Sequence, residues 1–228
     1  MILSLLFEFI YGQVTFLDLL QSLIFSFAAI LIAMTVHEFS HALAAYALGD
    51  KTAKADGRLS FNPLHHLDPW GLLLLLLFGF GWAKPVNINY SQLKHRRSGL
   101  AITAAAGPLS NLVTAFISVI FIVLAMYIPN YTVWYNLNEF LSYLAMFNIS
   151  LAVFNLIPIP PLDGSKILGE LLPAEARFKY YSIERYSTII LLAIIILFDR
   201  LGIFSALQMG VLNVIVRAVA GLFGLITG

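Results

Sequence analysis

Long runs of apolar residues, separated by short polar segments, dominate the chain. Five of these runs approach or exceed the roughly 20 residues that a membrane-spanning helix needs. They lie at about 16–48, 98–128, 137–157, 186–204 and 205–226. A sixth run, WGLLLLLLFGFGW at 70–82, is only about a dozen residues long. A run of that length is too short to cross a bilayer and is typical of a re-entrant or interfacial segment.

The segments between the runs predict loops. Residues 49–69 and 83–99 carry Gly, Pro, Asn and Asp, and they contain short alternating stretches that favour small β-type interfacial structures. The N-terminal MILSLLFEFIYGQ lacks the basic stretch and cleavage site of a signal peptide. We expect it to be retained as an interfacial helix or as the lead-in to the first span.

These patterns predict an all-α polytopic membrane protein with about five to six transmembrane helices, three of them forming the core. We expect a single domain over residues 1–228, with its core at about 16–170 and C-terminal helices at about 186–226. The composition agrees, because 60% of the residues are hydrophobic and 11% are charged. Soluble domains have about 45–50% apolar and about 25% charged residues. The lipid bilayer is therefore an expected partner.

Charge and cysteine content narrow the chemistry. The net charge of +1 indicates no nucleic-acid partner, and no feature defines the oligomeric state. The chain has no cysteine, which excludes disulfides, cysteine nucleophiles and thiolate metal ligands. Any metal ligands must then be His, Asp or Glu.

The basic residues predict the orientation in a cell membrane, because cytoplasmic loops carry an excess of Lys and Arg. They gather around the short run and after the third long run: Lys51, Lys54, Arg58, Lys84, Lys94, Arg96, Arg97, Lys166, Arg177, Lys179 and Arg185. Residues 127–139 carry none. We therefore expect 49–99 and 158–186 in the cytoplasm, and 127–137 and the N-terminus outside.

The stretch MTVHEFSHALA at 34–44 places three ionisable side chains inside an apolar run. His37 and His41 are four residues apart, so on a helix they lie on one face, one turn from each other. That spacing lets both imidazoles bind one Zn²⁺. Glu38 flanks the pair, where it can accept a proton from a water that the metal polarises. His41 lies about 12 Å from the expected cytoplasmic helix end, so the site would be nearer the cytoplasm.

Other interpretations of the two histidines remain open. They could stabilise a helix bundle by hydrogen bonds, although an unpaired Glu38 in an apolar run argues against this. The cluster could instead be the ion path of a membrane metal transporter. A substrate-binding scaffold without activity is a third possibility, which would have no need of the Glu38 carboxylate.

A catalytic zinc usually has three protein ligands, so a third is needed. The candidates are Asp50, Asp56, Asp68, Asp163, His65 and His66. Asp163 is favoured because it ends FNLIPIPPLDG, where three prolines interrupt an apolar run. Irregular backbone at membrane depth is tolerated where it lines a watery cavity. Gly164 then permits a tight turn that could aim the carboxylate inward.

Several motifs together resemble the site-2 protease family of intramembrane zinc metalloproteases. HEFSH lies within one span, GPLSN opens a later span, and NLIPIPPLDG closes another. NPLHHLDPWG and GFGWAKPV also resemble loops of the small bacterial and archaeal members, which have no appended PDZ or CBS domain. The resemblance covers about residues 28–170.

The resemblance implies that the chain hydrolyses peptide bonds in or near transmembrane segments of membrane proteins, as in regulated intramembrane proteolysis. It implies one Zn²⁺ per chain, held by His37, His41 and Asp163, with Glu38 as general base. It further implies that Asn155 lies near the scissile peptide and helps to stabilise the oxyanion. Ser165 stands where many members have a second glycine.

Supporting roles are less sharply defined. Asn111 could hydrogen-bond across the bundle or hold the Asp163 segment, and Gly107 could let helices approach closely, although both could also serve packing alone. The stretch after Lys84 and Pro85 could form an exposed strand that pairs with an extended substrate. It could equally be a basic interfacial loop.

Overall fold

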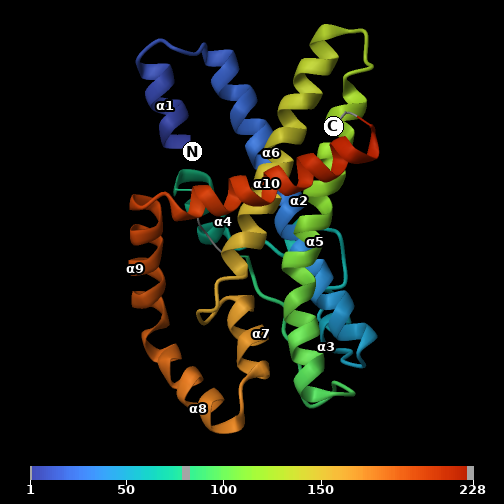
Figure 1. The fold of residues 1–228 in the computed structure, drawn as a ribbon, viewed down its shortest axis with the longest axis vertical. Helices are drawn as coiled ribbons and strands as arrows, with labels where there is room; N and C mark the ends of the chain where they lie inside the picture. Colours follow the sequence, from blue (N-terminus) through green and yellow to red (C-terminus); the bar gives the residue numbers. More distant parts are fainter. Residues whose placement is uncertain (1, 79–82, 225–228) are drawn as a thin grey trace.

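The computed structural model describes residues 2–78 and 83–224, and its centre is a three-helix core (Figure 1). α2 (Phe16–Ala47), α5 (Arg96–Ala125) and α6 (Tyr131–Asn155) pack against one another. The other helices are α1 (Ile2–Ile10), α3 (Thr52–Ala55), η1 (Pro63–His65), α4 (Pro69–Phe78), α7 (Asp163–Leu171), α8 (Ala174–Ser182), η2 (Ile183–Tyr186), α9 (Ser187–Arg200) and α10 (Ile203–Leu222).

Within the described residues, five helical stretches are long and apolar enough to cross a membrane. They are α2, α5, α6, α10 and the stretch Ala174–Phe198, which runs through α8, η2 and α9. This result confirms the predicted all-α polytopic membrane fold. The fourth stretch starts earlier than the hydropathy pattern predicts, because α8 and η2 lead into α9 without a break.

The length of α2 follows from its caps. Thr15 and Asp18 form a reciprocal capping box, in which the Thr15 side chain accepts from Asp18 N and the Asp18 carboxylate accepts from Thr15 N. The helix ends just before Gly49, whose φ of +109° suits glycine. Its 32 residues span about 48 Å, more than the hydrocarbon thickness, so its ends can reach water.

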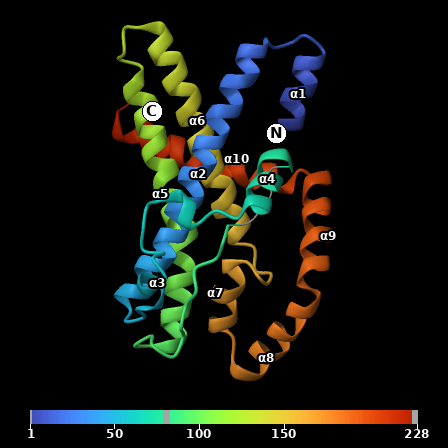
Figure 2. The same cartoon turned by 180° about the vertical axis from the view of Figure 1, so that it is seen from behind.

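Two apolar clusters hold the core together. Ala29, Ile30, Ala33 and Met34 of α2 pack against Leu141, Leu144 and Phe147 of α6. Ala115 and Val119 of α5 pack with Ala145 and Ile149 of α6 and with Ile215 and Val219 of α10. α10 therefore lies across α5 and α6, whereas α9 stands apart from the core in both views (Figures 1 and 2).

The loops differ from expectation in one respect. No strand forms among the described residues, and 83–89 is extended without a partner strand. Its amides are bound elsewhere: Lys84 N donates to His66 O, Val86 N to Glu38 and Asn89 N to Asp50. The short run at 70–82 becomes the ten-residue α4 up to Phe78, and residues 79–82 lie outside the described part.

Candidate metal centre

His37, His41 and Asp163 bring three ligand atoms together in the core. His37 Nε2 and His41 Nε2 lie 3.0 Å apart, and Asp163 Oδ2 lies 3.1 and 3.0 Å from them. All three residues are buried. The histidines lie one turn apart on α2, and Asp163 opens α7, so the site joins segments about 120 residues apart in the sequence.

The irregular segment between α6 and α7 delivers Asp163 to the site. α6 ends at Asn155, and the proline-containing residues 156–162 turn the chain back before α7 begins. Gly164 packs directly against the end of α6, since a Cβ there would lie 2.7 Å from Ile157 O and closer still to the Leu156 carbonyl. The glycine thus permits a backbone approach that no other residue would allow.

The Nδ1 atoms of His37 and His41 are each hydrogen-bonded to a carbonyl oxygen. His37 Nδ1 donates to Asn111 Oδ1 at 2.6 Å, and His41 Nδ1 donates to Thr103 O at 2.7 Å. Asn111 presents its oxygen to His37 because its amide nitrogen donates to Ala33 O and to Asn148 Oδ1. Both rings therefore donate through Nδ1, and a neutral ring then presents the lone pair of its Nε2 atom.

The donor set can hold a metal cation at its centre. Two imidazole lone pairs and a carboxylate oxygen face one another at about 3 Å. A tetrahedral Zn²⁺ with bonds of about 2.0–2.1 Å holds its ligands about 3.3 Å apart. The three residues fit that ion, with one position left open.

Gly107 lets α5 lie against the two imidazoles. A Cβ at this position would be 2.7 Å from His37 Nε2 and closer still to His41 Nε2. The following residue, Pro108, lies inside α5 and has no N–H to donate to the preceding turn. Any side chain at Gly107 would occupy the space of the ligand atoms.

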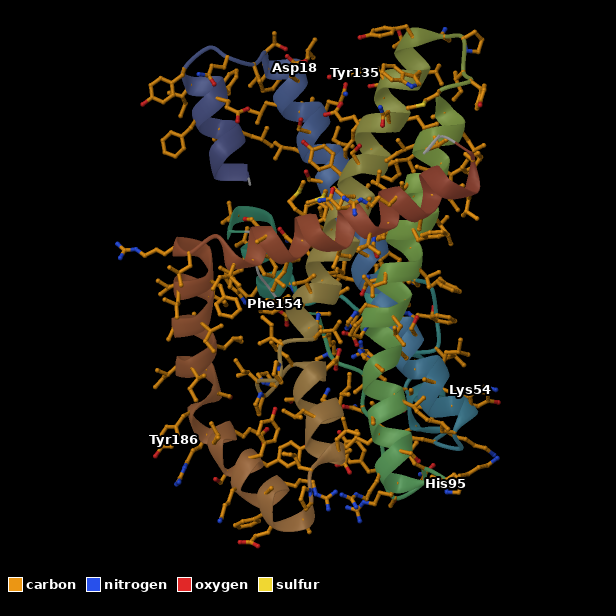
Figure 3. All side chains as sticks on the ribbon, viewed as in Figure 1. Asp18, Lys54, His95, Tyr135, Phe154 and Tyr186 are labelled. Carbon is orange, nitrogen blue, oxygen red and sulfur yellow. The ribbon has the colours of Figure 1, made fainter. Side chains whose placement is uncertain are left out.

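Glu38 and Asn155 line a cavity of about 320 Å³ together with the three ligand residues. Glu38 is buried, and its carboxylate accepts a hydrogen bond from Val86 N at 3.2 Å. The Asn155 amide donates one N–H back to Leu151 O in its own helix and keeps a second N–H available. Phe154, on the same helix, also lines the cavity, and it lies between the two ends of the molecule (Figure 3).

Lys166 adds a positive charge to the cavity wall. Its Nζ lies 3.1 Å from Asp163 Oδ1, one α-helical turn along α7. The contact leaves the other oxygen, Oδ2, facing the histidines. Sequence reasoning does not single out Lys166, because it is one of several basic residues that the predicted orientation already explains.

The other candidate ligands serve the loops. Asp50 accepts from Thr52 N and Asn89 N, Asp56 from Asn87, and Asp68 caps α4 through Trp70 N and Gly71 N. The rings of His65 and His66 donate to Gly57 O and Ser60 O. None of these side chains joins the cluster, so among the described residues Asp163 alone completes the pair of histidines.

The fold and the site define a polytopic membrane protein with a buried two-histidine, one-carboxylate metal centre. Comparison with known proteins gives the family. The sequence profile of "Peptidase family M50" matches residues 123–198. "Putative zinc metalloprotease YwhC" of Bacillus subtilis is 40% identical over 170 residues, which cover 73% of this chain and 78% of that protein.

Two further relatives carry similar names. "Putative zinc metalloprotease Rip2" of Mycolicibacterium smegmatis is 29% identical over 73% of this chain and 64% of its own length. "Putative zinc metalloprotease MJ0611" of Methanocaldococcus jannaschii is 37% identical over 43% of this chain and 48% of its own length. No solved structure matches the chain significantly.

The chain belongs to peptidase family M50, the site-2 proteases. This confirms the resemblance that its motifs indicated, and with it an intramembrane metalloprotease that uses zinc. The family also favours an enzyme over the metal transporter and over the inactive scaffold.

Proposed function

We propose that this protein hydrolyses peptide bonds in or near transmembrane segments of membrane-protein substrates, in the manner of regulated intramembrane proteolysis. The observation that carries the proposal is the convergence of three buried acceptor atoms on one point in a membrane-spanning core. His37, His41 and Asp163 would hold the zinc. When bound, zinc supplies a Lewis acid that polarises water and the scissile carbonyl.

Glu38 is the proposed general base. It follows His37 directly on α2, lines the same cavity and is buried. From there its carboxylate would take a proton from the attacking water and return it to the leaving amine. The hydrogen bond from Val86 N orients the carboxylate while leaving its other oxygen available.

The cavity wall supports recognition of an unwound substrate. A transmembrane helix satisfies its peptide groups internally, so it must open locally before attack. Ala83, Pro85, Val86 and Ile88 of the extended segment line the cavity. An extended substrate backbone would lie along this segment, and Asn155 would donate its second amide N–H to the developing oxyanion.

We infer that the active site faces the cytoplasmic half of the membrane. His41 lies six residues before the end of α2 at Ala47, or about 9 Å along the helix. Lys54 and His95 lie at that end of the molecule, and Asp18 and Tyr135 lie at the other (Figure 3). The basic loops predicted to be cytoplasmic thus lie at the end nearer the site.

The proposal is tested with purified protein in liposomes and a single-span test substrate. We expect mass spectrometry to locate the new termini in or beside the apolar segment. Glu38→Gln should lower the rate about 10²–10⁴-fold. Glu139→Gln is the matched control, because Glu139 is a half-buried carboxylate of α6 that contacts Gln21 and Ser22 and does not line the cavity of the metal centre.

Two outcomes would contradict the proposal. One is cleavage restricted to soluble loops of the substrate, which would separate the enzyme from intramembrane substrates. The other is zinc flux across the liposomes without any cleavage, which would support the transporter alternative.

A further inference from the structure

Asn148 is a fully buried polar residue of α6 that neither lines the cavity nor reaches a ligand atom. Both polar atoms of its side chain are nevertheless hydrogen-bonded. Nδ2 donates to Leu144 O at 2.7 Å, and Oδ1 accepts from Asn111 Nδ2 at 2.7 Å. An apolar residue would fill this position between packed helices without burying an amide, so the amide requires an explanation.

We propose that Asn148 is a positioning residue for the metal centre, acting through Asn111 to hold His37 in the tautomer that binds zinc through Nε2. The inference rests on the proposed ligand role of His37. It adds a residue on a third helix, since His37 lies on α2, Asn111 on α5 and Asn148 on α6.

The chain of hydrogen bonds has a fixed direction. Asn148 donates to the main chain of its own helix, so its oxygen must face Asn111. That oxygen accepts from the Asn111 amide nitrogen, which leaves the Asn111 oxygen to accept from His37 Nδ1 at 2.6 Å. A ring protonated at Nδ1 keeps its Nε2 lone pair free for a metal.

Rotation of the Asn111 amide would favour the other tautomer of His37, which cannot bind zinc through Nε2. The amide nitrogen would then face His37 Nδ1, which would have to become an acceptor, and the ring proton would move to Nε2. Two contacts oppose the rotation, one from Ala33 O at 3.0 Å and one from Asn148 Oδ1 at 2.7 Å. Removing Asn148 leaves only the longer contact and an unpaired buried N–H group.

The test measures zinc affinity by competition with a chelator, in purified protein. Hydrogen-bond partners of metal-binding histidines typically contribute 10–100-fold to metal affinity. We expect Asn148→Leu to weaken zinc binding about tenfold and Asn111→Leu at least as much. Asn148→Asp keeps an acceptor oxygen and, when protonated, a donor, so it should stay within about threefold of the wild type.

Ser118→Ala is the matched control. Ser118 is a buried polar residue of α5 whose hydroxyl donates to Thr114 O of the same helix, and its substitution should leave zinc affinity unchanged. Nitrogen NMR of histidine-labelled, metal-free protein gives a second readout. His37 should be protonated at Nδ1 in the wild type and partly at Nε2 in Asn148→Leu.

A double mutant separates positioning from general stability. In the Asn111→Leu background, Asn148→Leu should have no further effect on zinc affinity, because its route to His37 has been removed. An equal effect in both backgrounds, or a wild-type affinity in Asn148→Leu, would overturn the inference. If Asn148→Leu does not purify, Asn148→Ala makes the same comparison. Failure of the wild type itself to bind zinc would instead refute the proposed function.

Discussion

At the residue scale, the metal centre depends on small side chains as much as on its ligands. Gly107 leaves room for both imidazoles, and Gly164 lets α7 begin against the end of α6. Asn111 and the Thr103 carbonyl then set the ring orientations. Each of these residues helps to fix the position of a ligand atom. A displacement of about 1 Å at any of them would therefore lower the zinc affinity.

The first prediction concerns Gly107. In Gly107→Ala, the new methyl group would lie within 2.7 Å of His37 Nε2, so a ring must move and the ligand triangle must open. We expect zinc affinity to fall at least about tenfold, measured by chelator competition.

Gly210→Ala is the matched control for this prediction. Gly210 lies within α10, and a Cβ added there would meet no neighbouring side chain or other element within 4 Å, so the change should leave zinc binding intact. It should stabilise the helix by about 0.5–1 kcal/mol. Equal zinc binding in Gly107→Ala and in the wild type would contradict the close approach of α5.

At the element scale, α7 carries Asp163 and must be held in place. Glu170, near the end of α7, pairs with Arg177 of α8 at 2.8 Å and with Arg97 of α5 at 3.6 Å. Its carboxylate is largely buried, whereas both arginines are partly exposed. The group therefore joins three helices at the end of the molecule nearer the site.

The second prediction follows from this junction. Glu170→Gln removes the charge that both arginines share, and we expect it to destabilise the protein by about 1–2 kcal/mol, seen as a lower Tm in detergent. Glu175→Gln is the control, because the Glu175–Lys179 pair is highly exposed and such pairs contribute little. An unchanged Tm in Glu170→Gln would show that α7 is held by packing alone.

The sequence predicts a feature well when the residues that produce it lie close together in the chain, and poorly when they lie far apart. The four-residue spacing of His37 and His41 and the prolines before Asp163 act within one turn or one segment, and both indicated the metal site. The role of Asn148 is not local, because an Asn in an apolar run has the same pattern whether it packs or binds. Its proposed role follows from its hydrogen bond to Asn111, which lies 37 residues away in the sequence.

Two differences in the fold have the same origin. Hydropathy predicts the helix of α10 but not its course across α5 and α6, because that course depends on contacts of Ile215 and Val219 with other helices. Alternation predicts an extended chain at 83–89 but not whether a partner strand exists. In the structure, side-chain carboxylates bind its amides instead.

At the scale of the whole molecule, the distribution of charge predicts the orientation. The loop between α5 and α6 has no Lys or Arg, whereas the segment from Lys51, just before α3, to the start of α5 and the segment from α7 to η2 together carry eleven of the 13. This bias predicts that the loops near the metal centre are cytoplasmic.

The third prediction tests that orientation by cysteine labelling. The native chain has no cysteine, so single substitutions give an unambiguous signal. In intact cells, a membrane-impermeant maleimide should label Tyr127→Cys, in the α5–α6 loop, and should label Asp56→Cys only after permeabilisation. The cysteine-free protein is the control, and the reverse pattern of labelling would contradict the orientation.

Zinc binding and catalysis are separated by measuring the zinc content of three purified proteins beside their cleavage of a single-span transmembrane substrate. We expect one zinc per chain in the wild type, together with cleavage. Glu38→Gln should keep the zinc and lose cleavage, because it removes the proposed base and no ligand. Asp163→Ala should lose both. Full zinc occupancy in Asp163→Ala, or zinc-dependent cleavage by Glu38→Gln at a rate close to that of the wild type, would contradict the proposed zinc site and base.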